Sequence, residues 1–227
     1  MQQHLTPTLA IFDLDNTLIA GDSDQAWGQF LFERNAVDND YQENNNLFYQ
    51  QYHQGTLDIH QYLEFCLSTL AQHPLEQLQL WRSEFIDSII VPLILPKAVQ
   101  LIDKHRQAGD ILLIITATNS FVTAPIAQLL GIENLIAVEP EIQDNAYTGK
   151  VSGIPSFGKG KVERLNQWLI DKPFNLDGSY FYSDSINDLP LLQLVAKPIV
   201  VNADKALTTY ALEHKWQQLD LRDAVNR

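Results

Sequence analysis

The stretch LAIFDLDNTLIA, residues 9–20, joins a continuous apolar run to two carboxylates one residue apart. The apolar run predicts a buried β-strand over residues 8–13. Asp13 and Asp15 stand at its carboxyl end, with Thr17 close behind. A buried carboxylate is costly unless a partner offsets its charge. The stretch therefore predicts a strand that carries a charged site at its end.

Similar apolar segments recur along the chain, with helical patterns between them. The predicted strands are ILLIIT (111–116), SYFYSD (179–184), KPIVVN (197–202) and, more weakly, LIAVEP (135–140). Helical spacing marks residues 97–109, 119–131, 160–172 and the stretch after Pro190. Strands that alternate with helices indicate an α/β fold: a Rossmann-like parallel sheet with helices on both faces.

Residues 21–90 interrupt this alternation. They contain amphipathic helical patterns and no convincing strand, and about 70 residues is too long for an ordinary crossover. We expect an inserted all-helical cap domain over residues 21–90, above the carboxyl ends of the strands of a core domain formed by residues 1–20 and 91–227. A bulky surface insertion without function is the alternative.

Composition excludes several classes of function. The 227 residues carry a formal net charge of −13, which argues against nucleic acid or anionic membrane as a partner. No apolar run approaches a membrane span, and residues 1–8 lack the layout of a signal peptide. A single cysteine rules out an internal disulfide framework. We therefore expect a cytoplasmic protein that must hold any phosphate-bearing ligand by a local arrangement.

Acids and hydroxyls at the strand ends predict a metal site. Thr116 ends one strand and Asp184 another, and parallel neighbours bring these ends close to Asp13 and Asp15. Asp188 follows Asp184 on the next turn. Such a cluster would repel itself without a cation. Mg²⁺ fits best, because it uses few carboxylates and keeps sites open for water and phosphate.

The segment GKGKVERL could supply the positive partner. It places Lys159 and Lys161 in a glycine-rich turn at the start of a helix, where N–H groups also attract anions. The GxxxxGK[ST] spacing of a P-loop is absent. Taken alone, the segment favours a solvated lysine pair over a phosphate-binding site.

Together these motifs resemble those of the haloacid dehalogenase superfamily of phosphatases. The matching parts are DLDNT (13–17), the strand that ends at Thr116, Lys161 and SDSIND (183–188). The insertion after the first motif resembles the C1 cap of the phosphoserine-phosphatase-like branch, subfamily IB. The resemblance covers nearly the whole chain, and four ordered motifs are far more specific than any one of them.

The resemblance implies a role for each matching residue. Asp13 would be the nucleophile that forms an aspartyl-phosphate, and Asp15 would act as general acid and then general base. Thr116 and the N–H of Ala117 would hold phosphoryl oxygens. Lys161, whose context fits the family pattern better than that of the other lysine, would neutralise charge on nucleophile and phosphate.

The same resemblance implies the metal ligands. Asp184, the side chain of Asp13 and the backbone carbonyl of Asp15 would bind Mg²⁺. Asn187 and Asp188 would support the phosphate, the lysine and the metal-bound waters. Phosphoryl transfer depends mostly on such positioning and charge neutralisation.

The expected substrate is a small phosphorylated metabolite. Asp22 occupies the slot where phosphoserine phosphatases of this branch usually have a glutamate that binds substrate. Residues 35–81 contain six acids and no lysine or arginine, which disfavours a substrate with its own carboxylate, although Arg34 and Arg82 flank the stretch. Asp22, Asp24 and Asp110 could equally be helix caps or surface-turn residues.

An acidic, aromatic-rich cap suits an ester whose other end is neutral or cationic. FYQQYHQG supplies Phe48, Tyr49, Tyr52 and His53, which could stack on a ring or cation, or simply pack a helix. The opening and YSDSINDLPLL are similar to those of bacterial phosphatases of L-histidinol phosphate in this superfamily. We therefore expect L-histidinol phosphate as substrate, with phosphoserine or a broader set of metabolites as alternatives.

A receiver-like phosphoacceptor module is the rival from another class, since it also gathers acids, a Thr and a Lys on a parallel sheet. Such modules are about half this length and lack an acid at the position of Asp15. A dehalogenase is disfavoured too, because halide leaves without protonation. Sustained multiple turnover would discriminate between an enzyme and a signalling module.

Overall fold

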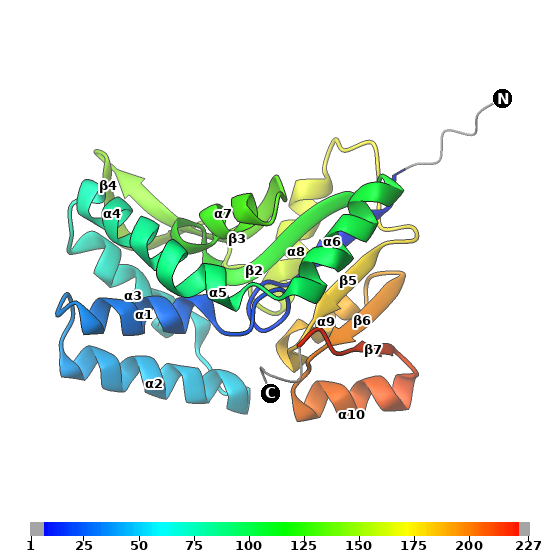
Figure 1. The fold of residues 1–227 in the computed structure, drawn as a ribbon, viewed down its shortest axis with the longest axis horizontal. Coiled ribbons are helices and arrows are strands. Elements are labelled where there is room, and N and C mark those ends of the chain that lie inside the picture. Colours follow the sequence, from blue (N-terminus) through cyan, green and yellow to red (C-terminus); the bar gives the residue numbers. More distant parts are fainter. Residues whose placement is uncertain (1–6, 223–227) are drawn as a thin grey trace.

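The computed structural model describes residues 7–222, so residues 1–6, where most of the signal-peptide expectation falls, lie outside the described part. Within it the strands form one sheet in the order β4-β3-β2-β1-β5-β6-β7 (Figure 1). All pairings are parallel except that of β3 with β4, which is antiparallel. The strands are β1 (Leu9–Phe12), β2 (Ile111–Asn119), β3 (Asn134–Gln143), β4 (Ala146–Ser152), β5 (Tyr180–Ser183), β6 (Lys197–Val201) and β7 (Gln217–Leu219).

The structure confirms the predicted α/β class and all five predicted strands, but β2 continues past Thr116 to Asn119, so Thr116 lies within the strand and not at its end. Two further strands extend the edges of the sheet. β4 returns from β3 through a turn in which Asp144 and Asn145 both have positive φ, as a tight antiparallel hairpin needs. β7 pairs with β6 at the opposite edge.

Helices cover both faces of the sheet, because alternate side chains of each strand point to opposite sides. Ala10 and Phe12 join one core cluster, whereas Leu9 and Ile11 join the other. α6 (Pro96–Ala108) and α7 (Ser120–Leu129) pack on the first face, and α8 (Lys159–Leu169), α9 (Leu189–Leu192) and α10 (Lys205–His214) on the second.

The segment between β1 and α6 consists of helices joined by turns, with an isolated β-bridge between Ile19 and Ile94. It contains α1 (Ser23–Glu33), α2 (Asn39–Gln54), α3 (Ile59–Ala71), α4 (Leu75–Phe85), the π-helical turn η1 (Ile86–Ile90) and α5 (Val91–Leu93). Figure 1 shows α1, α2 and α3 grouped at one end of the molecule, away from α10. We refer to residues 21–90 as the helical insertion.

Aspartates begin three helices of the insertion. Asp22, Asp38 and Asp58 accept hydrogen bonds from the first backbone N–H groups of α1, α2 and α3, which explains where these helices start. None of the helices within residues 7–222 combines the length and apolarity needed to cross a membrane.

Candidate active site

β1 brings its carboxylates to the centre of the sheet. It pairs with β2 on one side and β5 on the other, so the ends of these three strands lie together. Asp13 follows β1, Thr116 lies in β2 and Asp184 follows β5. All three residues are buried. The structure thus assembles, in one place, residues that are more than 60 positions apart in the chain.

Lys161 links two of the buried carboxylates. Its Nζ donates to Asp13 Oδ1 and to Asp188 Oδ2, both at 2.7 Å, and only 2% of the residue is exposed. Burial alone would lower the pKa of Lys161, but attraction by Asp13 and Asp188 outweighs it and raises that pKa. Ser183 Oγ also donates to Asp188 Oδ2, at 2.7 Å. Lys161 therefore stays protonated beside Asp13.

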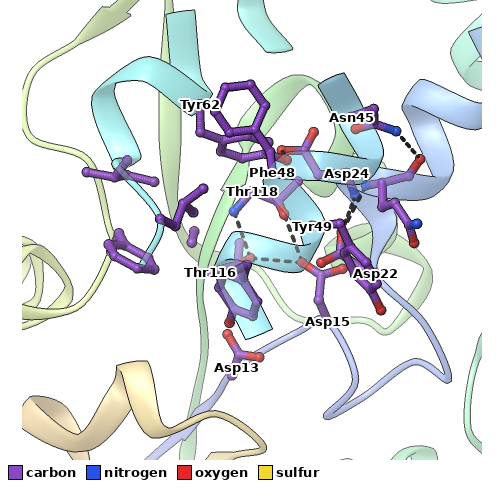
Figure 2. A pocket seen from close by; sticks show the side chains of 16 residues that line it. Asp13, Asp15, Asp22, Asp24, Asn45, Phe48, Tyr49, Tyr62, Thr116 and Thr118 are labelled. Carbon is purple, nitrogen blue, oxygen red and sulfur yellow. Dashed lines mark hydrogen bonds between the residues drawn. The ribbon is translucent and has the colours of Figure 1, made fainter. Parts of the chain in front are cut away.

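Asp15 is held between the sheet and the helical insertion (Figure 2). Its Oδ1 accepts from the backbone N–H of Ser23 at 2.6 Å, and its Oδ2 from Thr118 Oγ1 at 2.8 Å and, more weakly, Thr116 Oγ1 at 3.4 Å. Burial raises the pKa of Asp15 to about 6; repulsion by Asp22 adds to the rise, and the hydrogen bonds oppose it. A carboxyl with such a pKa can both give and take a proton near neutral pH.

Asp184 has no comparable partner among the described residues. Thr17 Oγ1 approaches its Oδ1 at 3.4 Å, and Lys161 contacts Asp13 and Asp188 instead. Burial raises the pKa of Asp184 well above its usual range, and repulsion from Asp13 and Asp188 adds to the rise. A second cation beside Asp184 and Asp13 would offset this charge.

The donor set at this position fits magnesium. Within residues 7–222 no group of three or more acidic, histidine or cysteine side chains could hold a metal by itself. Two carboxylates, those of Asp13 and Asp184, would need a main-chain oxygen and water to complete a coordination shell. That combination of few carboxylates and several waters is the one Mg²⁺ uses.

A pocket opens from these residues toward the helical insertion. Asp13 lies at one end of the residues drawn in Figure 2, and Asp24, Asn45 and Tyr62 lie toward the other. The described lining comprises Asp13, Asp15, Asp22, Asp24, Gln25, Asn45, Phe48, Tyr49, Tyr52, Leu57, Ile59, Tyr62, Thr116, Ala117, Thr118 and Phe157. The insertion therefore supplies more than half of the wall.

No lysine or arginine belongs to this described lining. Arg34 forms an ion pair with Glu84, and Arg82 donates to the carbonyl of Phe121 at 3.0 Å while lying over its ring. The two arginines that flank the acidic stretch therefore do not reach the pocket. Among the described residues that line this pocket, a substrate carboxylate would find no lysine or arginine.

Asp22, Asp24 and Asp110, which the sequence alone could equally place in helix caps or surface turns, have different environments in the structure. Asp22 is the N-cap of α1 and also lines the pocket. The surface or cap interpretation is wrong for Asp24, which is 6% exposed and accepts a hydrogen bond from Tyr62 Oη at 2.6 Å. Asp110 lies in the turn between α6 and β2, is partly buried, and accepts a hydrogen bond from His105 Nδ1 at 2.6 Å.

Other predicted residues lie at varying distances from the pocket. Ala117 lines the pocket. Asp188 is connected to the pocket through Lys161, which donates hydrogen bonds to both Asp188 and Asp13. Asn187 lies in the short turn η2 (Ile186–Asp188) and is not among the lining residues. Lys159 is exposed. Of the aromatic segment in α2, Phe48, Tyr49 and Tyr52 line the pocket, while the side chain of His53 lies outside the described part of the structure.

Sequence reasoning missed three contributors to the site. Thr118 lies two residues beyond Thr116 and so on the same face of β2, a periodicity that could have identified it. Ser183 could have been found by its position next to Asp184. Tyr62 is a distant residue of α3, and nothing local in the sequence places it on Asp24.

Comparisons with known proteins show which family has this combination of sequence and fold. The family model of the haloacid dehalogenase-like hydrolases matches residues 10–193. The chain is 44% identical over 219 residues to a histidinol-phosphatase of Neisseria meningitidis serogroup C (strain 8013), covering 94% of this chain and 99% of that protein.

Two solved structures extend the comparison. The crystal structure of a protein of unknown function from Bordetella pertussis Tohama I has a TM-score of 0.90 and 43% identity, covering 96% of this chain and 100% of that one. A phosphoserine phosphatase in the form of a phospho-aspartyl intermediate analogue has a TM-score of 0.71 and 18% identity, covering 97% and 96%. At that identity the second likeness shows the shared fold.

Proposed function

Since the chain belongs to the haloacid dehalogenase-like hydrolase family and is a phosphatase within it, we propose that it hydrolyses L-histidinol phosphate with Mg²⁺ through an aspartyl-phosphate intermediate. We further propose that residues 21–90 act as a cap domain over a core domain of residues 1–20 and 91–227. The pocket wall supplied by the helical insertion supports this division.

Asp13 is the nucleophile in this proposal. Lys161 holds Oδ1, whereas Oδ2 accepts no hydrogen bond from a described residue. A carboxylate oxygen of Asp13 attacks phosphorus, and the bond from phosphorus to the ester oxygen breaks. Lys161 offsets the negative charge on the phosphoryl oxygens. The hydroxyl of Thr116 and the N–H of Ala117, which also line the pocket, donate hydrogen bonds to these oxygens.

Asp15 handles the proton in both halves of the reaction. Protonated Asp15 gives its proton to the leaving alkoxide, and the resulting carboxylate then takes a proton from the attacking water. The bond between phosphorus and Asp13 breaks, and inorganic phosphate leaves. The pKa of about 6, set by burial, and the fixed hydrogen bonds from Ser23 and Thr118 suit these alternating roles.

Asp13, Asp184 and the main-chain carbonyl of Asp15 would hold the magnesium ion. When bound, the ion supplies positive charge that offsets the two carboxylates and the phosphate. Asp188 and Ser183 keep Lys161 directed at Asp13, and Asn187 belongs to the turn that carries Asp188. Removal of magnesium by a chelator should abolish phosphate release, and added Mg²⁺ should restore it.

One observation carries the choice of substrate: the described pocket wall combines acids and aromatic rings with no lysine or arginine. L-Histidinol offers an ammonium group and an imidazole ring and has no carboxylate. The name of the 44%-identical relative supports the same choice. Phosphoserine is the alternative, because Asp22 occupies the position from which its amino group could be bound.

The test is phosphate release by the purified chain with Mg²⁺, comparing L-histidinol phosphate with O-phospho-L-serine at equal concentrations. We expect kcat/KM to be at least about tenfold higher for L-histidinol phosphate. The carboxylate of phosphoserine would have no basic partner in the described pocket lining, and a difference of about 1.4 kcal/mol in free energy corresponds to a tenfold ratio. Asp13→Asn serves as the control for contaminating phosphatase. Faster hydrolysis of phosphoserine would reject the substrate, and a single turnover would favour a phosphoacceptor module.

A further inference from the structure

The pocket wall toward the helical insertion contains a buried acid that the catalytic steps do not use. Asp24 lies in the first turn of α1, and Asp22 already caps that helix. The Asp24 carboxylate accepts hydrogen bonds from Tyr62 Oη at 2.6 Å and from Asn119 Nδ2 at 3.3 Å. None of these partners is a cation.

Burying a carboxylate in this way is costly, since neutral donors only partly replace water. Burial raises the pKa of Asp24 to about 6, the hydrogen bond from Tyr62 opposes the rise, and repulsion by Asp15 adds to it. An apolar residue would suit a purely structural position at this depth. The free protein thus keeps an acid where a ligand cation would relieve its cost.

A second polar group lines the same pocket. Asn45, from α2, is 3% exposed, and its Nδ2 donates to the carbonyl of Gln25 at 3.3 Å. Its Oδ1 accepts no hydrogen bond from any described residue. A Cβ at position 28 would come within 2.6 Å of Asn45 Nδ2, so Gly28 is what lets α1 approach this amide. The local packing therefore accommodates an acceptor that has no donor among the described residues.

Aromatic rings complete this part of the pocket. Tyr62 and Phe48 both line it, with ring centroids 5.5 Å apart. Ring faces attract cations, and the effect is larger where water is excluded. Figure 2 shows Asp24 between Tyr62 and Asn45.

We propose that Asp24 is a specificity-determining residue, which together with Asn45 Oδ1 accepts hydrogen bonds from a protonated nitrogen of the leaving group. Tyr62 is a positioning residue that fixes the orientation of the Asp24 carboxylate. The inference rests on the proposed phosphatase function of the same pocket, and it names the substrate class: phosphomonoesters of amino alcohols.

The test compares three esters with the wild-type holoenzyme and the Asp24→Asn variant. L-Histidinol phosphate and 2-aminoethyl phosphate carry a protonated nitrogen, whereas 2-phenylethyl phosphate carries none. We expect Asp24→Asn to lower kcat/KM for the two nitrogen esters by about 10- to 100-fold more than for 2-phenylethyl phosphate, mainly through KM. An equal loss for all three esters, or no loss, would overturn the proposal.

Tyr62→Phe tests the positioning role. It should raise KM for the nitrogen esters in the same direction as Asp24→Asn but less, and it should add nothing in the Asp24→Asn background. Additive losses would contradict a role that acts through Asp24. Glu64→Gln, which removes the same charge from an exposed position of α3, is the matched control and should keep the wild-type preference.

A binding measurement separates this inference from the proposed substrate. Calorimetric titration with free L-histidinol and with 2-phenylethanol needs no turnover. Weaker binding of L-histidinol to Asp24→Asn, with 2-phenylethanol unaffected, supports the role of Asp24 even if L-histidinol phosphate is hydrolysed poorly. Hydrolysis of L-histidinol phosphate with unchanged L-histidinol binding in the variant would instead leave the proposed function standing and reject Asp24.

Discussion

At the scale of single residues, Lys159 and Lys161 show how two positions separate a surface group from a buried one. Lys159 begins α8 in solvent, whereas Lys161 is buried and contacts two carboxylates. The sequence places both lysines in one glycine-rich turn, and local sequence properties do not show which of the two is buried in the site. Helical geometry decides, because residues two apart face different directions.

Replacing these lysines gives a paired prediction. Lys161→Met should lower kcat at least about a hundredfold, because the phosphoryl charge loses a fixed donor. It should also destabilise the fold by about 3–5 kcal/mol, since Asp13 and Asp188 are left buried without their cation. Lys159→Met should keep both properties. Steady-state assays and urea unfolding measure the two effects, and equal behaviour of the two variants would contradict the geometry.

The proposed role of Asp15 predicts that the two halves of the reaction can be separated in the Asp15→Asn variant. With p-nitrophenyl phosphate the leaving group needs no proton, so Asp15→Asn should still release nitrophenol in the first turnover. The second half of the reaction then lacks its base and should stall. Stopped-flow absorbance should show a burst of about one nitrophenol per active site followed by slow turnover. A variant with neither burst nor turnover would show that Asp15 is needed for attack itself.

At the scale of elements, the start of α8 depends on the absence of a side chain. A Cβ at Gly160 would overlap the carbonyl oxygen of Pro155, a backbone atom that cannot move aside alone. Gly160 N–H also donates to the carbonyl of Phe157 at 2.8 Å. The close approach fixes the turn from which Lys161 enters the site.

Gly160→Ala should therefore damage both stability and catalysis. We expect a loss of at least about 2 kcal/mol in the free energy of unfolding, as in other overpacked sites, and a lower kcat from displacement of Lys161. Gly153→Ala is the control. Gly153 has a positive φ, but no atom lies within 4 Å of the new Cβ, so the free energy of unfolding should fall by only about 1 kcal/mol. Thermal melts that rank the two variants in reverse would contradict this account.

The edge strands show where element prediction from sequence ends. β4 has the sequence AYTGKVS and β7 has QQL, which lack the continuous apolar run that marks the central strands. β4 forms because the β3–β4 hairpin packs under α3, where Gly149 lies against Ala71 and Ser68. β7 forms because β6 offers it an open edge. Both depend on partners distant in sequence.

At the scale of the whole molecule, the fold gathers several acids around one pocket. Burial raises the pKa of Asp15, Asp22 and Asp24 to about 6 each. In the unfolded chain these groups have lower pKa values and bind fewer protons between about pH 4 and 6. The folded state then binds more protons than the unfolded state, so stability is present at low pH and is lost as pH rises through the folded pKa values.

Asp24→Asn tests this linkage. The metal-free wild type should lose stability as pH rises from about 4 to 7, and the variant should lose less. A shift from 3.8 to about 6 corresponds to at most about 3 kcal/mol at 1.36 kcal/mol per pKa unit. Urea unfolding at both ends of the range measures the difference. An identical pH dependence in the two proteins would show that Asp24 keeps its ordinary pKa in the fold.

The sequence by itself determined the central strands, the alternation with helices and the position of the helical insertion, because these follow from the period and length of apolar runs. It also pointed to Asp13, Asp15, Thr116 and Asp184, since parallel strands end together. Only the tertiary structure decided that Arg34 and Arg82 turn away from the pocket and that Tyr62 donates a hydrogen bond to Asp24. Those contacts join residues from different helices, and helix packing leaves no local trace in the chain.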